Sequence, residues 1–443
     1  MKVYVVGGYV RDLYLGIEGK DIDFVVIGDA LQLAESFKKN FKTGKVVSYP
    51  RFGTAMLTYR DFKLEFVSAR SETYDKNSRK PAVIKSGLKS DLSRRDFTMN
   101  TLAMNISAEN FGKVIDVFQG KSDIDHQIIR TPQDPVITFS DDPLRMLRAI
   151  RFATVLHFDI EPETYQAIIK TRERLKIVSQ ERITEELRRM LLASEPSSGM
   201  YLLRETGIAE IIFPELLALS GVEQREDFHH KDVFHHTLKV LDNISAMTNK
   251  FELRLAALLH DIAKPQTKRF VKGIGWTFHG HEDVGGRMVE KIGRRMRLPI
   301  NLIKYVEKLV RLHLRPMQLV DDSVTDSAIR RLMVEAGEDL EDLMMLCRAD
   351  ITSKNPEKVK RYLNNFDLVE EKMKVVEEKD NLRNFKLAID GNMIMKTLDL
   401  LPGPLIGRIK NAITDAVLDG DIPNEEFACV EYMMKVKEHF LDH

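Results

Sequence analysis

The stretch VVGGYVRDLYLGIEGKDIDFVVIG, residues 5–28, decides the fold of the N-terminal region. A short apolar strand ends at a Gly-Gly pair, and a second apolar strand follows about a dozen residues later. Glycines leave backbone N–H groups accessible and carry no side chain, so a triphosphate can approach the chain closely at Gly8. Arg11 is placed to neutralise such an anion. The stretch therefore predicts two strands joined by a turn that accepts phosphate.

The second strand carries two carboxylates. Asp21 and Asp23 alternate with Ile22 and Phe24, and because strand side chains alternate, both acids are expected on one face. Two such acids can hold a pair of Mg²⁺ ions about 3.5–4 Å apart. A third acid, Glu65, lies in the strand-like run KLEFVSAR, where a charge is costly to bury. Solvent-exposed strand positions are the alternative interpretation.

Beyond the first 120 residues or so, the apolar pattern changes period. Strand-like runs at residues 3–6, 22–27, 55–59, 64–67 and 114–117 give way to apolar residues spaced three and four apart, as in DPLRMLRAIRFATVL and FELRLAALLHDIAK. The sequence therefore predicts the α+β class. An N-terminal α/β head, with helices around a mixed sheet, is followed by a region that is expected to be all α.

The composition limits the classes of function. The 443 residues include 67 Lys and Arg and 67 Asp and Glu, so a nucleic acid would have to bind a local basic surface such as residues 286–316. A solvated helix face is the alternative for that run. Cys347 and Cys429 are the only cysteines, which excludes a disulfide framework and a thiolate metal cluster. No signal peptide or membrane span is recognisable, and we expect a cytoplasmic protein.

A second notable stretch is SDDPLRMLRAIRFA, residues 140–153. Ser140, Asp141 or Asp142 can cap a helix that has a proline in its first turn. Two arginines three residues apart lie on a different face from the apolar stripe. They form either a solvated basic face or a surface that contacts a ligand.

Five motifs together resemble the bacterial tRNA nucleotidyltransferases, or CCA-adding enzymes, and the related bacterial poly(A) polymerases. In order they are GGYVRDLYLG, DID, RRDFTMNTLAMNI (residues 94–106), DDPLRMLRAIRFA and ERITEEL (residues 181–187). The resemblance covers the whole chain. It implies template-independent addition of CCA to the 3′ end of tRNA from CTP and ATP, with Mg²⁺ in the head.

The resemblance also implies site residues. The first block would bind triphosphate and metal, with catalytic acids Asp21, Asp23 and Glu65. The RRDFT block would contact the ribose, although Asp96 could instead cap a helix. In the DDPLR block an Asp can accept from a base amino group while an Arg donates to the ring; Asp141 replaces the Glu usual in the family. The implied nucleotide-binding residues are Gly8, Arg11, Arg94, Arg95, Asp96, Asn100, Asp141, Asp142, Arg145 and Arg148.

Residues 71–87 are polar and rich in turn formers, which predicts a mobile loop. In the family, a loop here that starts Arg-x-Glu-x-Tyr resembles the element needed to switch from C to A addition. Arg70, Glu72 and Tyr74 fit that start. The fit favours addition of the full CCA over addition of CC alone.

A second constellation reproduces the H…HD…H…H…D order of the HD phosphohydrolases. Its residues are His236, His260, Asp261, His281, His313 and Asp350. Imidazole and carboxylate suit a divalent ion such as Ni²⁺, Co²⁺ or Mn²⁺ that carries an activated water. The resemblance implies hydrolysis of 2′,3′-cyclic phosphates and phosphomonoesters, as in repair of tRNA ends. Buried core histidines are the alternative.

The resemblance implies four domains and leaves other functions open. They are a catalytic head (1–125), a helical neck for base recognition (126–200), an HD body (201–352) and a helical tail that binds tRNA (353–443). The expected partners are tRNA, CTP and ATP but no membrane, in a monomer or homodimer. Alternatives are a poly(A) polymerase, a partial CC- or A-adding enzyme, and an HD hydrolase with a non-catalytic RNA-binding head.

Overall fold

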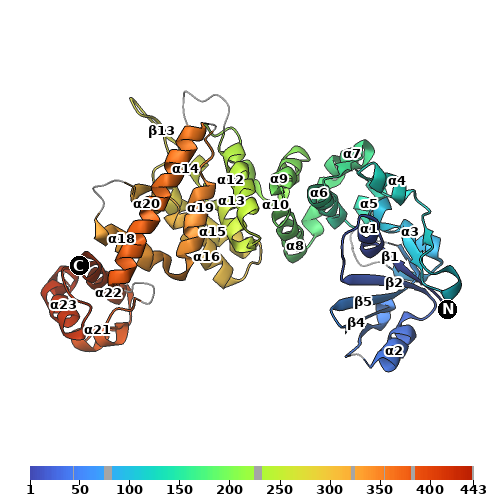
Figure 1. Cartoon of the computed structure of the whole chain (residues 1–443), viewed down its shortest axis with the longest axis horizontal. Coiled ribbons are helices and arrows are strands. Elements are labelled where there is room, and N and C mark those ends of the chain that lie inside the picture. Colours follow the sequence, from blue (N-terminus) through green and yellow to red (C-terminus); the bar gives the residue numbers. More distant parts are fainter. Residues whose placement is uncertain are drawn as a thin grey trace. The chain divides into compact units, whose positions relative to one another are not determined.

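The structure, a computed structural model, describes residues 1–42, 44–73, 82–223, 232–320, 325–353, 355–380 and 385–441. They fall into two units, Met1–Leu217 and Ala218–His443 (Figure 1). The first holds a mixed sheet and a set of helices, and the second is mostly helical. The α+β class predicted from the sequence is confirmed. Within the described residues, no helix is long and apolar enough to span a membrane.

The sheet of the first unit has seven strands in the order β3-β4-β5-β2-β1-β8-β9. β2 and β5 run parallel, and the other neighbouring strands run antiparallel. The strands are β1 (Lys2–Val6), β2 (Asp21–Ile27), β3 (Val47–Tyr49), β4 (Thr54–Tyr59), β5 (Phe62–Ser68), β8 (Ala103–Asn105) and β9 (Val114–Ile115). Smaller pairs are β6 (Arg70–Thr73) with β7 (Ala82–Lys85), and β10 (Ile128–Ile129) with β11 (Asp159–Ile160).

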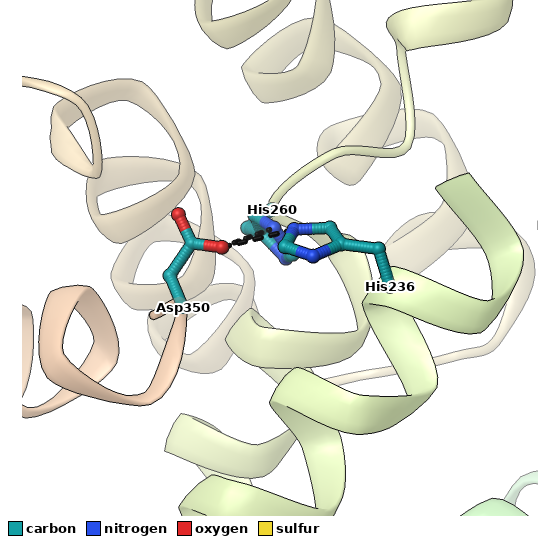
Figure 2. A group of neighbouring side chains, drawn as sticks. All are labelled: His236, His260 and Asp350. Atoms are coloured by element: carbon teal, nitrogen blue, oxygen red, sulfur yellow. Dashed lines mark ion pairs between the residues drawn. The ribbon is translucent and has the colours of Figure 1, made fainter. Parts of the chain in front are cut away.

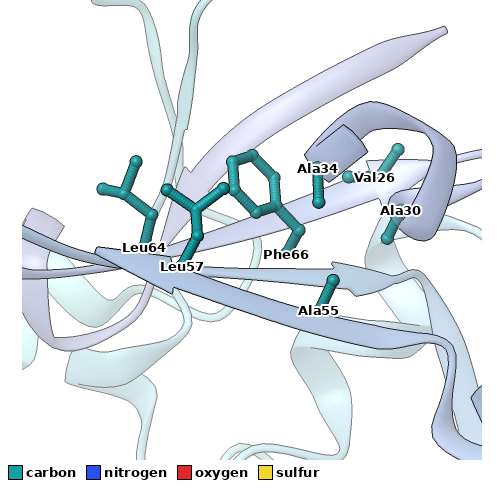
Figure 3. Close-up of a cluster of buried hydrophobic side chains, with 7 residues drawn as sticks. All are labelled: Val26, Ala30, Ala34, Ala55, Leu57, Leu64 and Phe66. Atoms are coloured by element: carbon teal, nitrogen blue, oxygen red, sulfur yellow. The ribbon is translucent and has the colours of Figure 1, made fainter. Parts of the chain in front are cut away.

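The two faces of this sheet differ in what they pack against and in which side chains they carry. Helix α2 (Ala30–Phe41) packs on one face, where Val26, Leu64 and Phe66 form a buried apolar cluster with its alanines (Figure 3). Residues of opposite parity on the same strands point to the other face, where Val25 packs with Leu92. The odd-numbered acids of β2 and β5 therefore lie on the face away from α2.

The other helices of the first unit lie between the strands of the sheet and after them. They are α1 (Gly8–Tyr14), α3 (Leu88–Ser93), α4 (Gly120–Asp125), α5 (Pro135–Asp141), α6 (Leu144–Leu156), α7 (Pro162–Thr171), α8 (Gln180–Leu191), α9 (Pro196–Glu205), α10 (Ile208–Ile212) and α11 (Pro214–Leu217). Short 3₁₀ helices are η1 (Pro50–Phe52), η2 (Thr98–Asn100), η3 (Ala108–Asn110) and η4 (Arg172–Ile177).

The start of α6 differs from the sequence expectation. Ser140 and Asp141 do not cap it, because they form the last turn of α5, which Asp134 caps by accepting from Ile137 N at 2.9 Å. Asp142 alone is placed for capping: its Oδ1 accepts from Leu144 N at 3.2 Å.

The second unit contains the remaining helices. They are α12 (Val233–Met247), α13 (Phe251–Leu259), α14 (Lys264–Thr267), α15 (His281–Arg295), α16 (Ile300–Leu312), α17 (Arg315–Gln318), α18 (Asp326–Ala336), α19 (Leu340–Ala349), α20 (Pro356–Asp380), α21 (Gly391–Leu398), α22 (Pro404–Asp419) and α23 (Glu426–Leu441), with η5 (Gly337–Asp339). The last three pack around their own apolar cluster, which includes Ile394, Ile413 and Met433.

The expectation that everything after the head is helical is wrong in two places. The two-residue strands β10 and β11 pair within the predicted neck, and the second place lies in the second unit. Strands β12 (Arg269–Val271) and β13 (Gly275–Thr277) form an antiparallel hairpin between α14 and α15. Its strands are only three residues long, too short for a period of two to stand out from helical spacing. Two glycines in the turn, Gly273 and Gly275, adopt φ of 85° and 92°, which a helix does not allow.

Candidate active sites

Three carboxylates of the head, Asp21, Asp23 and Glu65, form the first candidate site and are called the head acids below. The parallel pairing of β2 with β5 sets Asp23 directly beside Glu65. Asp21 lies two residues earlier on the same face, next to Lys63, whose Nζ is 4.0 Å from Asp21 Oδ1. Asp21 is exposed, while Asp23 and Glu65 are half-buried. Pairing between strands thus brings together acids that lie 42 residues apart in the sequence (65 minus 23).

Burial is the main influence on the ionisation of two of the head acids, Asp23 and Glu65. Burial raises the pKa of Asp23 above its ordinary value, although Arg95 and Arg148 favour the charged form. Burial and the charge of Asp23 likewise raise the pKa of Glu65. Carboxylates that repel one another in this way are suited to share bound cations, and their hard oxygen atoms fit Mg²⁺.

Glycine at the end of β1 allows an arginine to approach the head acids. Gly7 has φ of 78°, and a Cβ atom there would lie 2.8 Å from Arg95 Nη1 and 3.6 Å from Asp23 Oδ2. Any other residue would push the guanidinium away or strain the backbone. The Gly-Gly pair therefore serves packing at Gly7 as well as the phosphate approach expected at Gly8.

Asp96 of the RRDFT block is the centre of a buried network. It is 7% exposed; its Oδ2 accepts from Arg148 Nε at 2.8 Å and its Oδ1 from Asn100 Nδ2 at 2.9 Å. Asn100 Oδ1 in turn accepts from Arg11 Nη1 at 2.7 Å. Burial opposes ionisation, but Arg148 and these hydrogen bonds hold the pKa of Asp96 far below its usual range. Asp96 is not the cap of η2, whose N-cap residue is Phe97.

The arginines of α6 reach back to the head and across to α8. Arg145 Nη2 donates to the backbone oxygen of Arg94 at 2.6 Å. Arg148 pairs with Asp96, and Arg151 Nε lies 3.0 Å from Glu186 Oε2, both of them buried. A solvated basic face is therefore wrong for these side chains. They tie the RRDFT block to the helices that follow the sheet.

Two residues of this network were missed by sequence reasoning. Glu186 lies in the ERITEEL motif and is 5% exposed in the structure. The available signal in the sequence was its position next to the apolar stripe of Ile183 and Leu187. The ring of Phe152 packs under the guanidinium groups of three arginines, with 4.1 Å from Arg151 Cζ to the ring centroid. Nothing in the spacing distinguishes Phe152 from an ordinary core aromatic.

The remaining nucleotide-binding candidates lie around the same blocks. Asp142 Oδ2 is 3.5 Å from Arg182 Nη2 on α8, and Arg94 Nη2 donates to the fully buried Asp91 at 2.8 Å. Arg70 starts β6, with Nη1 donating to the backbone oxygen of Phe52 at 2.6 Å. Tyr74 lies outside the described part of the chain, so the loop expected to switch from C to A addition is not defined there.

Four histidines and two aspartates meet in the second unit and are called the histidine–aspartate cluster. They form two adjoining groups, and within each group the ligand atoms lie within 4.8 Å of one another: His236, His260 and Asp350; and Asp261, His281 and His313. Figure 2 shows the two imidazoles of the first group facing the Asp350 carboxylate. His236 Nε2 is 2.9 Å from Asp350 Oδ1.

Asp261 joins the two groups. Its Oδ2 lies 3.2 Å from His260 Nε2 and its Oδ1 lies 3.3 Å from His281 Nε2. The Nζ of Lys264 is 2.7 Å from Asp261 Oδ2. Asp261 is 1% exposed, and despite burial the charges of His260 and Lys264 hold its pKa well below the usual range. A bridging carboxylate of this kind can serve two ions at once.

The backbone orients three of the four imidazoles in the cluster, and a threonine hydroxyl orients the fourth. The Nδ1 atoms of His260, His281 and His313 each lie 2.7–2.8 Å from the carbonyl oxygen three residues earlier. The Nδ1 atom of His236 lies 3.0 Å from Thr352 Oγ1. Because a carbonyl oxygen only accepts, Nδ1 carries the proton in the first three rings, and the Nε2 lone pair points into the cluster. This is the arrangement of metal-ligating histidines.

The electrostatics of the cluster fit a bound cation. His260 Nε2 is buried and has no hydrogen-bond partner. Burial disfavours a charged imidazole, yet Asp261 and Asp350 raise the pKa of His260 to about 10. Burial and neighbouring His260 instead lower the pKa of His313 to about 4. The buried Asp261 and the half-buried Asp350 thus favour positive charge at the centre, which a divalent metal ion would supply.

Comparison with known families divides the chain into three matched regions. Residues 3–130 match the family described as the Poly A polymerase head domain. Residues 157–219 match a probable RNA and SrmB-binding site of polymerase A, and residues 233–355 match the HD domain.

Relatives with these regions include a multifunctional CCA protein of Neisseria gonorrhoeae, which is 34% identical over 71% of this chain and 74% of its own length. An A-adding tRNA nucleotidyltransferase of Deinococcus radiodurans is 31% identical over 78% of this chain and 79% of its own. Among solved structures, a Bacillus stearothermophilus CCA-adding enzyme in complex with CTP has a TM-score of 0.63 at 23% identity, covering 99% of this chain and 93% of that one. The chain therefore belongs to the tRNA nucleotidyltransferases of the poly(A) polymerase family, and it carries an HD domain.

Proposed function

We propose that this chain adds CCA to the 3′ end of tRNA from CTP and ATP, with two Mg²⁺ ions held by the head acids. The observation that carries the proposal is the pairing of β2 with β5, which sets Glu65 beside Asp23 on the face that also holds Asp21. Bound there, Mg²⁺ would activate the attacking 3′ hydroxyl and neutralise the triphosphate. A solved structure of a tRNA nucleotidyltransferase complexed with a primer tRNA and an incoming ATP analog supports the same proposal. It is 25% identical to this chain with a TM-score of 0.59, and the match covers 84% of this chain and 96% of that one.

The protein side chains have separate tasks in this proposal. Gly8 and Arg11 receive the triphosphate, and Arg95 lies between phosphate and acids, next to Asp23. The Asp96–Arg148 pair holds the RRDFT block in position for the ribose. Most contacts of these groups are already satisfied inside the protein, so the surface that meets nucleotide is preorganised.

Choice of base is assigned to the start of α6. Asp142 accepts from the amino group of cytosine or adenine, and Arg145 donates to the ring. Asp142 also lies against Arg182, which limits how far its carboxylate can turn. In this assignment residues 1–125 form the catalytic head, 126–200 the neck for base recognition, 201–352 the HD body and 353–443 a tail that binds tRNA.

The A-adding relative from Deinococcus radiodurans supports a second candidate, addition of only part of the CCA. The deciding experiment uses tRNA transcripts that end at the discriminator base, at C and at CC, each incubated with CTP, ATP or both. Full CCA addition predicts growth of all three to CCA. Growth of only the CC transcript, with ATP alone, would instead identify an A-adding enzyme, and long A tails would identify a poly(A) polymerase.

For the HD domain we propose metal-dependent hydrolysis of 2′,3′-cyclic phosphates and phosphomonoesters, with Ni²⁺, Co²⁺ or Mn²⁺. The observation that supports it is the orientation of four Nε2 atoms around the carboxylates of Asp261 and Asp350. Such chemistry would restore damaged tRNA ends before nucleotides are added. Hydrolysis of 2′,3′-cyclic AMP by the full chain, with each metal added in turn after chelation, tests it. Transcripts that are never extended, together with active hydrolysis, would favour an HD hydrolase with an RNA-binding head.

Two further points accompany the proposed function. Cys347 and Cys429 are both buried and unpaired with each other, which fits the reducing cytoplasm where tRNA is processed.

The basic run at residues 286–316 lies on α15 and α16, where Arg311 and Lys308 pair with acids of neighbouring elements. The run is therefore a weaker candidate for tRNA contact than its sequence indicates.

A further inference from the structure

The β12/β13 hairpin is the feature of the second unit that the proposed functions leave unused. Figure 1 shows it projecting beyond the surrounding helices at the label β13. Phe270 and Trp276 face each other across the two strands, with their ring centroids 5.2 Å apart in an edge-on arrangement. Phe270 is 53% exposed and Ile274, at the turn, is 75% exposed. Large apolar side chains that remain in solvent at the end of a narrow hairpin mark a surface for binding.

Both ends of the hairpin are anchored in the histidine–aspartate cluster. Before β12, Lys264 bonds to Asp261 and its Nζ lies 5.6 Å from the centroid of the Phe278 ring. After β13, the carbonyl oxygen of Phe278 lies 2.8 Å from His281 Nδ1. Each strand has three residues, so at about 3.3 Å per residue the hairpin extends about 10 Å from these anchors. The exposed rings are therefore held within reach of a molecule bound at the cluster.

The charge of the hairpin is of one sign. Residues 262–281 contain four Lys and Arg and no Asp or Glu. Lys268 lies over the Trp276 ring, with its Nζ 4.1 Å from the centroid, and Arg269 and Lys272 are exposed. Basic side chains interleaved with aromatic rings are the pattern that binds single-stranded nucleic acid, where the cations contact phosphate and the rings stack on bases.

We propose that the hairpin is the nucleotide-recognition element of the HD site and that Phe270 stacks on the base of an RNA 3′ end whose terminal phosphate enters the histidine–aspartate cluster. Lys268 and Arg269 contact phosphates of the same strand. The inference rests on the proposed hydrolytic function and adds the element that recognises the base of its substrate, which the histidine–aspartate cluster alone does not contact. A membrane surface or a second copy of this chain would be attracted by the apolar rings, but neither accounts for anchoring in the metal ligands.

A kinetic experiment separates recognition of the base from hydrolysis. The variants are Phe270→Ala and, as a control, Met247→Ala, which removes another exposed apolar side chain of the same unit, at the end of α12 and outside the proposed tRNA-binding tail. The substrates are adenosine 2′-phosphate and glycerol 2-phosphate, two phosphomonoesters of which only the first has a base. Phe270→Ala should raise KM for adenosine 2′-phosphate about ten-fold and leave kcat within two-fold. Glycerol 2-phosphate hydrolysis by Phe270→Ala, and hydrolysis of both substrates by Met247→Ala, should stay within about two-fold of wild type.

A binding experiment decides the inference even if no hydrolysis occurs. Trp276 is the single tryptophan of the chain, so its fluorescence reports on the hairpin alone. A short oligoribonucleotide with a 3′ phosphate, titrated into the full chain with CTP present to occupy the head, should quench this fluorescence. The oligonucleotide concentration that gives half-maximal quenching should rise about ten-fold in Phe270→Ala and stay unchanged in Met247→Ala.

Three outcomes would overturn the inference. The first is an equal loss on both substrates in Phe270→Ala, which would make the ring structural. The second is fluorescence that does not respond to the oligonucleotide. The third is a wild-type dimer that dissociates in Phe270→Ala, which would assign the ring to a second copy of the chain. Absence of any hydrolysis by wild-type protein would count against the proposed HD activity alone, since the fluorescence titration would still decide whether the hairpin binds RNA.

Discussion

The head acids and the histidine–aspartate cluster are two ways of arranging carboxylates for metal ions. In the head, one acid is exposed and two are half-buried on neighbouring strands, and burial raises the pKa of Asp23 and of Glu65. In the second unit, Asp261 and Asp350 lie among four imidazoles and a lysine. Their pKa values fall well below the usual range despite burial.

The difference follows from the balance of charge around each group. The histidine–aspartate cluster carries its own cationic and hydrogen-bonding partners, so its side chains are preorganised. We call the site closed in the sense that these partners come from the protein itself. The head acids repel one another and depend on Arg95 and on cations that arrive with the triphosphate. A site that must admit a nucleotide and an RNA end at every step is expected to be open in this way. A closed site is expected to keep its ion between reactions.

The largest effect that this comparison predicts is in the head. Asp23→Ala should reduce nucleotide addition by at least about a thousand-fold, because a lost metal ligand removes several kcal/mol of transition-state stabilisation. The fold should not weaken, since a raised pKa means that the folded state already disfavours this charge. Incorporation of labelled CMP into a tRNA transcript and thermal unfolding measure the two quantities.

The control for this variant is Asp61→Ala. Asp61 lies in the β4–β5 turn with a side chain that is 80% exposed, and its carboxylate is 3.7 Å from Lys20 Nζ. Removing it should change nucleotide addition less than two-fold, because a surface ion pair contributes little. An Asp23→Ala protein that still extends tRNA at a near wild-type rate would refute the assignment of the head acids.

The second prediction concerns the closed site. Asp261→Ala should lower hydrolysis of 2′,3′-cyclic AMP at least about a hundred-fold and lower bound metal, because Asp261 contacts both groups of ligands. CCA addition should survive, because the head holds its ions on other residues. Metal content by mass spectrometry and the two activities are measured side by side with Asp283→Ala, whose side chain is 65% exposed. Loss of both activities would mean that Asp261 is needed for folding.

Local patterns account for the parts of these sites that the sequence indicated. Alternation along one strand was enough to place Asp21 and Asp23 on one face, and the order of histidines and aspartates was enough to select the second set. Parallel pairing of β2 with β5 is not local, so Glu65 was found only as a charge in an apolar run. The partnership of Asp96 with Arg148 spans 52 residues and depends on where α6 packs, which no periodicity contains.

The same reasoning explains the errors. Ser140 and Asp141 have the residue types of a helix cap, but α5, whose start Asp134 caps, continues through them. The β12/β13 hairpin was predicted as part of a helical region because strands of three residues are too short to show a period of two. In the hairpin, the pairing of two strands decided the structure over the propensity of single residues. At Ser140 and Asp141, the continuation of α5 decided it.

The third prediction tests whether the Asp96 network is structural. Asp96→Asn should destabilise the first unit by about 2 kcal/mol, because it leaves the half-buried Arg148 without the charge of Asp96. The folded pKa of Asp96 is depressed, so its contribution is fully present above pH of about 4 and is lost as the pH falls below that value. Calorimetry between pH 6 and pH 3, following the transition that CTP raises, should therefore show a steeper acid loss in wild type than in the variant.

The control is Glu173→Gln, which removes the acid of an exposed pair with Lys176. Its screened charge should leave both the transition and its pH dependence nearly unchanged. Equal acid sensitivity in wild type and in Asp96→Asn would show that other carboxylates cause the acid loss.

The smallest effect is expected at the start of α6, where the head meets the helices that follow it. Asp142→Ala should reduce the preference for CTP and ATP over UTP and GTP about ten-fold while changing triphosphate affinity less, because in the proposed function the carboxylate contacts the base edge. Arg145→Ala should reduce selectivity and affinity together, since its guanidinium also holds the backbone of Arg94 at 2.6 Å.

Arg189→Ala, which breaks an exposed pair with Glu185 on α8, is the matched control and should change neither selectivity nor affinity. Competition assays with all four nucleotides give the ratios. Uniform loss of all four nucleotides in Asp142→Ala, with the CTP and ATP preference intact, would make this face a structural link between the sheet and α8.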